Sequence, residues 1–132
     1  MIKAALLLFR ENHGTTEILF VRARGKPYYI FPGGKQEADE TIEEALQREL
    51  QEELGAQATN MKKLGVVHGH TPDGTNLEMH LYTGSLQGEP HPRSEIEELI
   101  WMSRDVVLRN PEKMTPMSID HVLPFLAEQK VW

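Results

Sequence analysis

The feature that most constrains this chain is the window of residues 34–56, GKQEADETIEEALQRELQEELGA. Its apolar residues recur at helical spacing, because successive residues of an α-helix turn by about 100°. Thr41 and Glu44 have the spacing of a capping box, and Gly55 is a favoured residue type just past a helix end. The window therefore predicts a helix that follows a glycine turn and places one apolar side against a core.

Three glutamates of this helix lie at or within its apolar side. Glu49 and Glu53 fall within about 20° of Ile42 on the helix circumference, and Glu52 falls at the edge of the apolar stripe. A carboxylate that faces a core is costly unless it is paired or bound to a metal, and two neighbouring carboxylates raise each other's pKa. A divalent cation such as Mg²⁺ removes both costs. The alternative, a solvated acidic face, suits the glutamates on the far side of the helix.

The same window is similar to the Nudix box, G-x5-E-x7-R-E-U-x-E-E-x-G-U, in which U is a bulky aliphatic residue. The small residue Ala56 at the last U position is the one departure, and it weakens a packing contact without touching the chemistry. The matching residues are Gly34, Glu40, Arg48, Glu49, Leu50, Glu52, Glu53 and Gly55.

The resemblance implies a Nudix hydrolase of the MutT-like kind, which cleaves a nucleoside diphosphate linked to another group with the help of Mg²⁺ or Mn²⁺. It implies that Glu49, Glu52 and Glu53 are metal ligands and that a carbonyl of the Gly33–Gly34 turn joins them. It also implies that Arg48 orients the carboxylates of the box and that Glu40 fixes the loop. Residues 1–132 are then expected to form a single Nudix domain with its box at 34–56.

The rest of the chain predicts an α/β fold. Strands are expected over residues 2–10, 17–24 and 96–102, and a hairpin over 61–70 and 76–86, with the box helix between them. Ser103 is expected to begin a short helix, and Ser118 to cap a terminal helix over 116–129. This order of elements fits an α/β/α sandwich with a mixed β-sheet.

Several residues near the glycine turn are candidates for contacts with a substrate. The one basic concentration of an acidic chain is Arg22, Arg24, Lys26 and Lys35. Of these, Arg22, Arg24 and Lys35 are candidates for phosphate binding, and at least one is expected to make such a contact, although strand-end charges are often simply solvated. The amides of Gly33 and Gly34 can approach an anion closely. Tyr29 precedes the turn and could stack on a base, although aromatic residues at strand ends are more often part of the core.

A second acidic region lies late in the chain. Many members of the family use an acidic residue from this region as an extra metal ligand or base, which makes Glu98 a catalytic candidate, with Glu95 beside it. A charged strand edge or loop is the alternative. His68, His70 and His80 show no spacing typical of a zinc site, so they are expected to be ordinary histidines.

Composition excludes several classes of function. The chain has 132 residues, no cysteine and a net charge of −6, so it has no disulfide framework or thiolate nucleophile, and it is unsuited to long nucleic acid. Its longest apolar run is far too short to span a bilayer, and its start reads as a strand, so a cytoplasmic protein without membrane contact is expected.

The leading hypothesis is therefore a pyrophosphohydrolase of a nucleoside triphosphate or damaged nucleotide. ADP-ribose, a nucleotide sugar or a dinucleoside polyphosphate remain alternatives. A nucleotide-binding sensor without turnover is a second class, although sensors usually lose carboxylates of the box. An isomerase of related fold generally uses a cysteine, which this chain lacks. The family contains many dimers, which leaves a homodimer open.

Overall fold

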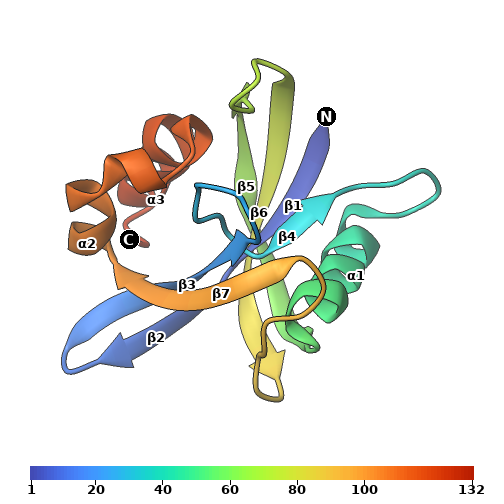
Figure 1. Cartoon of the computed structure of the whole chain (residues 1–132), viewed down its shortest axis with the longest axis horizontal. Coiled ribbons are helices and arrows are strands. Elements are labelled where there is room, and N and C mark those ends of the chain that lie inside the picture. The colour runs from blue at the N-terminus through green and yellow to red at the C-terminus, as the bar shows by residue number, and fades with distance from the viewer.

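The computed structural model describes residues 1–132 as two β-sheets between helices (Figure 1). The first sheet has the order β4–β1–β6–β5, from β1 (Ile2–Leu7), β4 (Gly33–Lys35), β5 (Gln57–His70) and β6 (Asn76–Gln87). It is mixed, because β1 runs parallel to β6 while the other pairs are antiparallel. The second sheet is antiparallel and has the order β2–β3–β7, from β2 (Phe9–Asn12), β3 (Thr15–Ala23) and β7 (Ile96–Ser103).

Both sheets are covered on both faces. Along β1, Ala4 and Leu6 belong to one buried cluster, while Ala5 and Leu7 belong to the other. This alternation follows from the period of two in a strand, and it requires apolar residues at every position of a strand with two covered faces. Helix α1 (Ile42–Leu54) covers one cluster, and the C-terminal helices cover the other, on the opposite side of the strands in Figure 1. The expected α/β/α arrangement is confirmed.

Helix α1 begins and ends as its sequence predicts. The Thr41 side chain accepts a hydrogen bond from the Glu44 amide, and the Glu44 side chain accepts one from the Thr41 amide. Gly55 ends the helix in the left-handed conformation at φ 66°. The apolar side of the helix is buried through Ala45, Leu46, Leu50 and Leu54.

The structure corrects the first predicted strand. Residues 2–10 are two strands rather than one, because the chain leaves the first sheet after Leu7 and enters the second at Phe9. The carbonyl of Leu8 between them accepts a hydrogen bond from the Leu19 amide of β3. One continuous apolar run therefore contributes strands to both sheets, and its hydropathy alone does not show where it passes from one sheet to the other.

The terminal helix also differs from its prediction. The short helix α2 (Arg104–Arg109) is capped by Ser103 as expected, and a 3₁₀ turn follows at Pro111–Lys113. The helix of residues 116–128, however, has a π-helical turn at Ser118–Val122 before α3 (Leu123–Glu128). Pro124 lacks an amide hydrogen, so the regular helical bond is missing here, and the Leu123 amide bonds instead to the Ser118 carbonyl.

Ser118 is therefore inside this helix and does not cap it. The Thr115 hydroxyl accepts a hydrogen bond from the Ser118 amide, which makes Thr115 the residue that caps the first turn. None of the helices is long and apolar enough to cross a membrane.

Candidate active site

The glycine turn becomes strand β4, which lies at the edge of the first sheet beside β1. Gly33 has φ 139°, and a β-carbon there would lie 2.0 Å from the carbonyl oxygen of Ala4. A β-carbon on Gly34 would lie 2.4 Å from the carboxyl carbon of Glu49. Both positions require glycine, and the second allows a carboxylate of α1 to lie directly against the backbone of β4.

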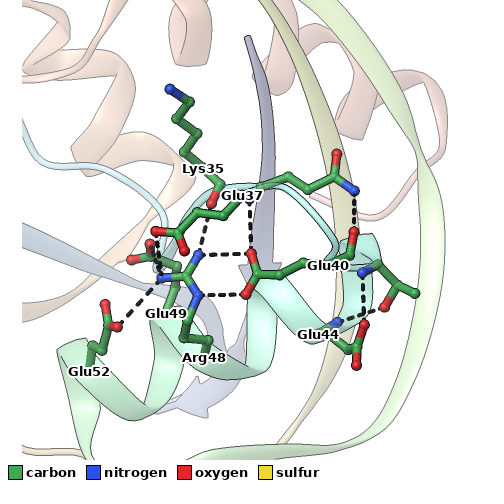
Figure 2. Close-up of polar contacts among 9 residues, drawn as sticks. Lys35, Glu37, Glu40, Glu44, Arg48, Glu49 and Glu52 are labelled. Carbon is green, nitrogen blue, oxygen red and sulfur yellow. Dashed lines mark hydrogen bonds and ion pairs between the residues drawn. The ribbon is translucent and has the colours of Figure 1, made fainter.

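Arg48 ties the loop before α1 to the helix (Figure 2). Its guanidinium donates to both carboxylate oxygens of Glu40, at 2.6 and 3.1 Å, and to the Lys35 carbonyl at 3.0 Å. It also donates to Glu49 at 3.0 Å. This pairing lowers the pKa of Glu40, so that carboxyl group is ionised at neutral pH. The planar fork of arginine suits such a network, and lysine could not reproduce it.

Glu53 is the most deeply buried charged side chain of the protein. It is 4% exposed, and Gly33 donates its amide hydrogen to the Glu53 carboxylate at 3.2 Å. Burial raises the pKa of Glu53 to about 9, although the Gly33 amide opposes the shift, and the neighbouring Glu49 and Glu95 carboxylates raise it further. Burial also raises the pKa of Glu49, although Arg48 opposes that shift. Two carboxyl groups therefore lie together in a setting that disfavours their ionised forms.

These groups fit a divalent cation, because a cation would offset both the burial and the mutual repulsion of the two carboxylates. Glu52 is half exposed and lies 3.5 Å from the same Arg48 nitrogen that donates to Glu49. No group of three or more His, Asp or Glu side chains is gathered closely enough to hold a metal ion alone. Mg²⁺ commonly takes one or two protein carboxylates and completes its coordination with water and substrate phosphates.

Glu98 and Arg22, both predicted as site residues, are paired with each other. Arg22 donates to Glu98 at 3.2 Å and lies 3.2 Å from Glu97, and the Tyr29 hydroxyl donates to Glu98 at 2.9 Å. In this arrangement each of the two charges has a partner within the protein. The charge of Glu95, by contrast, raises the pKa of the buried Glu53.

A loop carries Glu95 to this position. The amides of His91 and Arg93 donate to the carbonyls of Leu54 and Glu53, both at 3.0 Å, and so satisfy orphan carbonyls at the end of α1. The Arg24 amide donates to the Glu95 carbonyl at 2.7 Å. The backbone of Arg24 is therefore beside the site, while its side chain is exposed.

An apolar pocket opens beside Gly33 and Gly34, on the face of the sheet opposite α1. Its floor includes Ala5, Leu77 and Met79, and its walls come from Phe31, from the hairpin turn at 71–72 and from residues 115–118. The hydroxyls of Thr115 and Ser118 are 3.1 Å apart at this wall. Such a pocket, mostly apolar with a few polar groups, suits a flat organic ring.

The sequence did not predict the residues of this pocket. Its lining comes from segments more than a hundred residues apart in the chain, and no motif links them. One signal was present, since Lys3 interrupts the apolar start of the chain and the structure places it in the lining. The hydroxyl of Tyr29, the residue expected to stack on a base, donates a hydrogen bond to Glu98.

Comparisons with known proteins agree with this geometry. The family model "NUDIX domain" matches residues 1–123. The chain is 33% identical over 102 residues to the CTP pyrophosphohydrolase of Escherichia coli K12, a match that covers 74% of this chain and 70% of that protein. It is 29% identical over 114 residues to the 8-oxo-(d)GTP phosphatase of Mycolicibacterium smegmatis, covering 80% of this chain and 35% of that protein.

A solved structure extends the likeness to the fold. The crystal structure of a MutT NUDIX hydrolase from Burkholderia pseudomallei superposes with a TM-score of 0.67 at 26% identity, and covers 79% of this chain and 83% of that one. With the family model matched over most of its length and with the box helix and the mixed sheet in their expected places, this chain belongs to the Nudix hydrolase family.

Proposed function

We propose that residues 1–132 form one catalytic domain, a Mg²⁺- or Mn²⁺-dependent pyrophosphohydrolase of a nucleoside triphosphate or damaged nucleotide. The observation that carries the proposal is the pair of carboxylates formed by the buried Glu53 and the partly buried Glu49 against Gly33 and Gly34, next to an apolar pocket. The pair is the kind of site that a cation with a phosphate ligand would stabilise, and the pocket can receive the base of the same molecule.

Each residue of the site then has a defined task. Glu49 and Glu53 would hold the cation, with Glu52 reaching it after release from Arg48 and with the Gly33 carbonyl as a further oxygen ligand. When bound, the cation neutralises charge on phosphate oxygens and lowers the pKa of a coordinated water. Arg48 keeps the Glu49 carboxylate in place through its hydrogen bond and fixes the preceding loop through Glu40.

Glu95 is the residue best placed to take a proton from an attacking water, because it lies near Glu53 and is held by the loop on α1. Glu98 has a supporting task in this proposal, since its contacts with Arg22 and Tyr29 join β3, β7 and the segment before the glycine turn. The proposal thus moves to Glu95 the catalytic role that the sequence suggested for Glu98.

The choice of a nucleoside triphosphate rests on two supports. Relatives named as a CTP pyrophosphohydrolase and as an 8-oxo-(d)GTP phosphatase act on nucleotides of this class. The pocket is also bounded closely by the hairpin turn and by residues 115–118, which suits a single base more than a second nucleoside or sugar.

The experiment is a turnover assay with Mg²⁺ on canonical and oxidised triphosphates, ADP-ribose, nucleotide sugars and dinucleoside polyphosphates, with products resolved by chromatography. Glu53→Gln is the inactive comparison, and Glu128→Gln, at the exposed end of α3, is the matched control. We expect the wild type and the Glu128→Gln control to hydrolyse one triphosphate, and Glu53→Gln to hydrolyse none of the compounds.

Retained turnover in Glu53→Gln would contradict the assignment of the site. Binding of a nucleotide without turnover of any compound would favour the second candidate, a sensor. Preference for ADP-ribose, a nucleotide sugar or a dinucleoside polyphosphate would keep the chemistry and replace the substrate.

A further inference from the structure

Two lysines lie directly opposite each other on neighbouring strands. Lys3 of β1 pairs with Lys35 of β4 in the antiparallel register of the first sheet. Side chains opposite each other in such a pair project from the same face of the sheet, with β-carbons about 5 Å apart. Like charges in this arrangement repel each other and destabilise the sheet, unless a negative group lies between them.

The protein supplies no such group. No carboxylate lies within 4.0 Å of either ammonium group, and neither ammonium donates a hydrogen bond within the chain. Arg22 and Arg48, by contrast, are each neutralised by two or more glutamates. In a chain with a net charge of −6, two facing lysines without an acidic partner are unexpected on structural grounds alone.

The lysine pair is on the pocket side of the edge strand. Gly34 faces Glu49, and because successive residues of a strand face opposite sides, Lys35 faces away from that carboxylate. Figure 2 shows the Lys35 side chain extending away from Glu49 and Arg48. Lys3 lines the apolar pocket together with Gly33 and Gly34.

Solvation is the simplest alternative for a surface lysine, and it suits Lys35, which is exposed. It does not suit Lys3, which is half-buried with its stem on the pocket floor beside Met79. A lysine in this place keeps its charge at the mouth of the pocket while its methylene groups cover apolar surface.

We propose that Lys3 and Lys35 together bind a phosphate group of the substrate on the pocket side of β4. The phosphate chain then crosses the edge strand at Gly33 and Gly34, where no side chain obstructs it, and reaches Glu49 and Glu53 on the other side. The proposal rests on the proposed function in taking a nucleotide as the ligand. It adds Lys3 as a substrate-binding residue and fixes the direction in which the nucleotide lies.

The test is a binding measurement in EDTA, where hydrolysis does not interfere. Calorimetry compares CTP with cytidine and GTP with guanosine, on the wild type, Lys3→Gln, Lys35→Gln and the double variant. Lys62→Gln, an exposed lysine of β5, is the matched control. Thermal unfolding without ligand establishes that each variant is folded.

We expect each single substitution to weaken triphosphate binding about tenfold, as loss of a charge-assisted hydrogen bond implies. Nucleoside binding and the Lys62→Gln control should be unchanged. With Mg²⁺, Lys3→Gln should raise KM by a similar factor while kcat stays within about threefold, since the interaction is made equally in the ground state.

Three outcomes would overturn the proposal. Unchanged triphosphate affinity in Lys3→Gln would show that Lys3 does not bind the phosphate. A wild type that binds no triphosphate would also contradict the proposal. An equal loss for the nucleoside would mean that Lys3 contacts the base rather than a phosphate. A protein that binds triphosphate through these lysines but hydrolyses nothing would refute the proposed function and leave this inference intact.

Discussion

Replacing Glu53 by glutamine should change how the stability of the metal-free protein depends on pH. The pKa of Glu53 in the folded protein is about 9, against 4.5 as its ordinary value, chiefly because the carboxyl group is buried. Between these values the folded state holds a proton that the unfolded state has released. The stability that the folded protein gains from keeping Glu53 protonated is therefore complete below pH 4.5, and it is lost progressively as the pH rises towards 9.

The magnitude follows from linkage. Because the folded state holds one proton more than the unfolded state, the free energy of unfolding falls by about 1.4 kcal/mol for each unit by which the pH rises. Between pH 6 and pH 8 the fall is about 3 kcal/mol. For a chain of 132 residues this corresponds to a fall in Tm of roughly 10 °C. Glutamine keeps the carbonyl that accepts from the Gly33 amide but cannot ionise, so the variant should lose this part of the slope.

The assay is thermal unfolding in EDTA at pH 6, 7 and 8 for the wild type, Glu53→Gln and Glu52→Gln. Glu52 is half exposed, so its variant retains the buried carboxyl group and should follow the wild type. Adding Mg²⁺ at pH 8 should raise the Tm of the wild type and leave that of Glu53→Gln nearly unchanged, since binding to the folded state stabilises it. Equal pH slopes for the wild type and Glu53→Gln would refute the reasoning.

Three further substitutions test the geometry of the site. Gly34→Ala places a methyl group on the carboxylate of Glu49, so we expect kcat to fall about 100-fold with the circular dichroism spectrum retained; a fall of less than threefold would argue against this contact. Arg48→Lys loses the fork that joins the loop to the helix and should lower the free energy of unfolding in urea by about 1–3 kcal/mol, along with turnover; unchanged stability would show that the network is dispensable. Glu95→Gln should reduce kcat far more than Glu98→Gln does, because the charge of Glu95 acts on the buried Glu53, whereas Glu98 is held by Arg22 and Tyr29; the reverse order in a steady-state assay would support Glu98 as the catalytic residue.

The comparison of Glu95 with Glu98 shows where sequence reasoning reached its limit. Both residues follow the same loop and both were candidates. The backbone bonds of that loop to the end of α1 bring Glu95 near Glu53, while the register of β7 on β3 pairs Glu98 with Arg22. Glu95 and Glu98 are only three residues apart, and the local sequence does not distinguish their roles, because the position of each side chain depends on a contact with a distant segment.

Local patterns were sufficient for the helix and its chemistry. The capping box, the apolar period and the terminal glycine act within a few residues of one another, so the sequence alone determined where α1 begins and ends and that Glu53 and Glu49 face inward. The sequence identified Gly34 by its place in the box, whereas its close contact with the Glu49 carboxylate, which only glycine permits, was decided by the structure.

Tertiary structure alone decided the pocket and the charges around it. The split of residues 2–10 between two sheets, the π-helical turn near Pro124 and the pairing of Lys3 with Lys35 all depend on which segments meet across the sheet. A periodic pattern records which face of an element is buried, but not which partner buries it. For this protein the sequence therefore determined the carboxylates of the site, whereas the surroundings that bind the rest of a nucleotide were decided by packing between segments far apart in the chain.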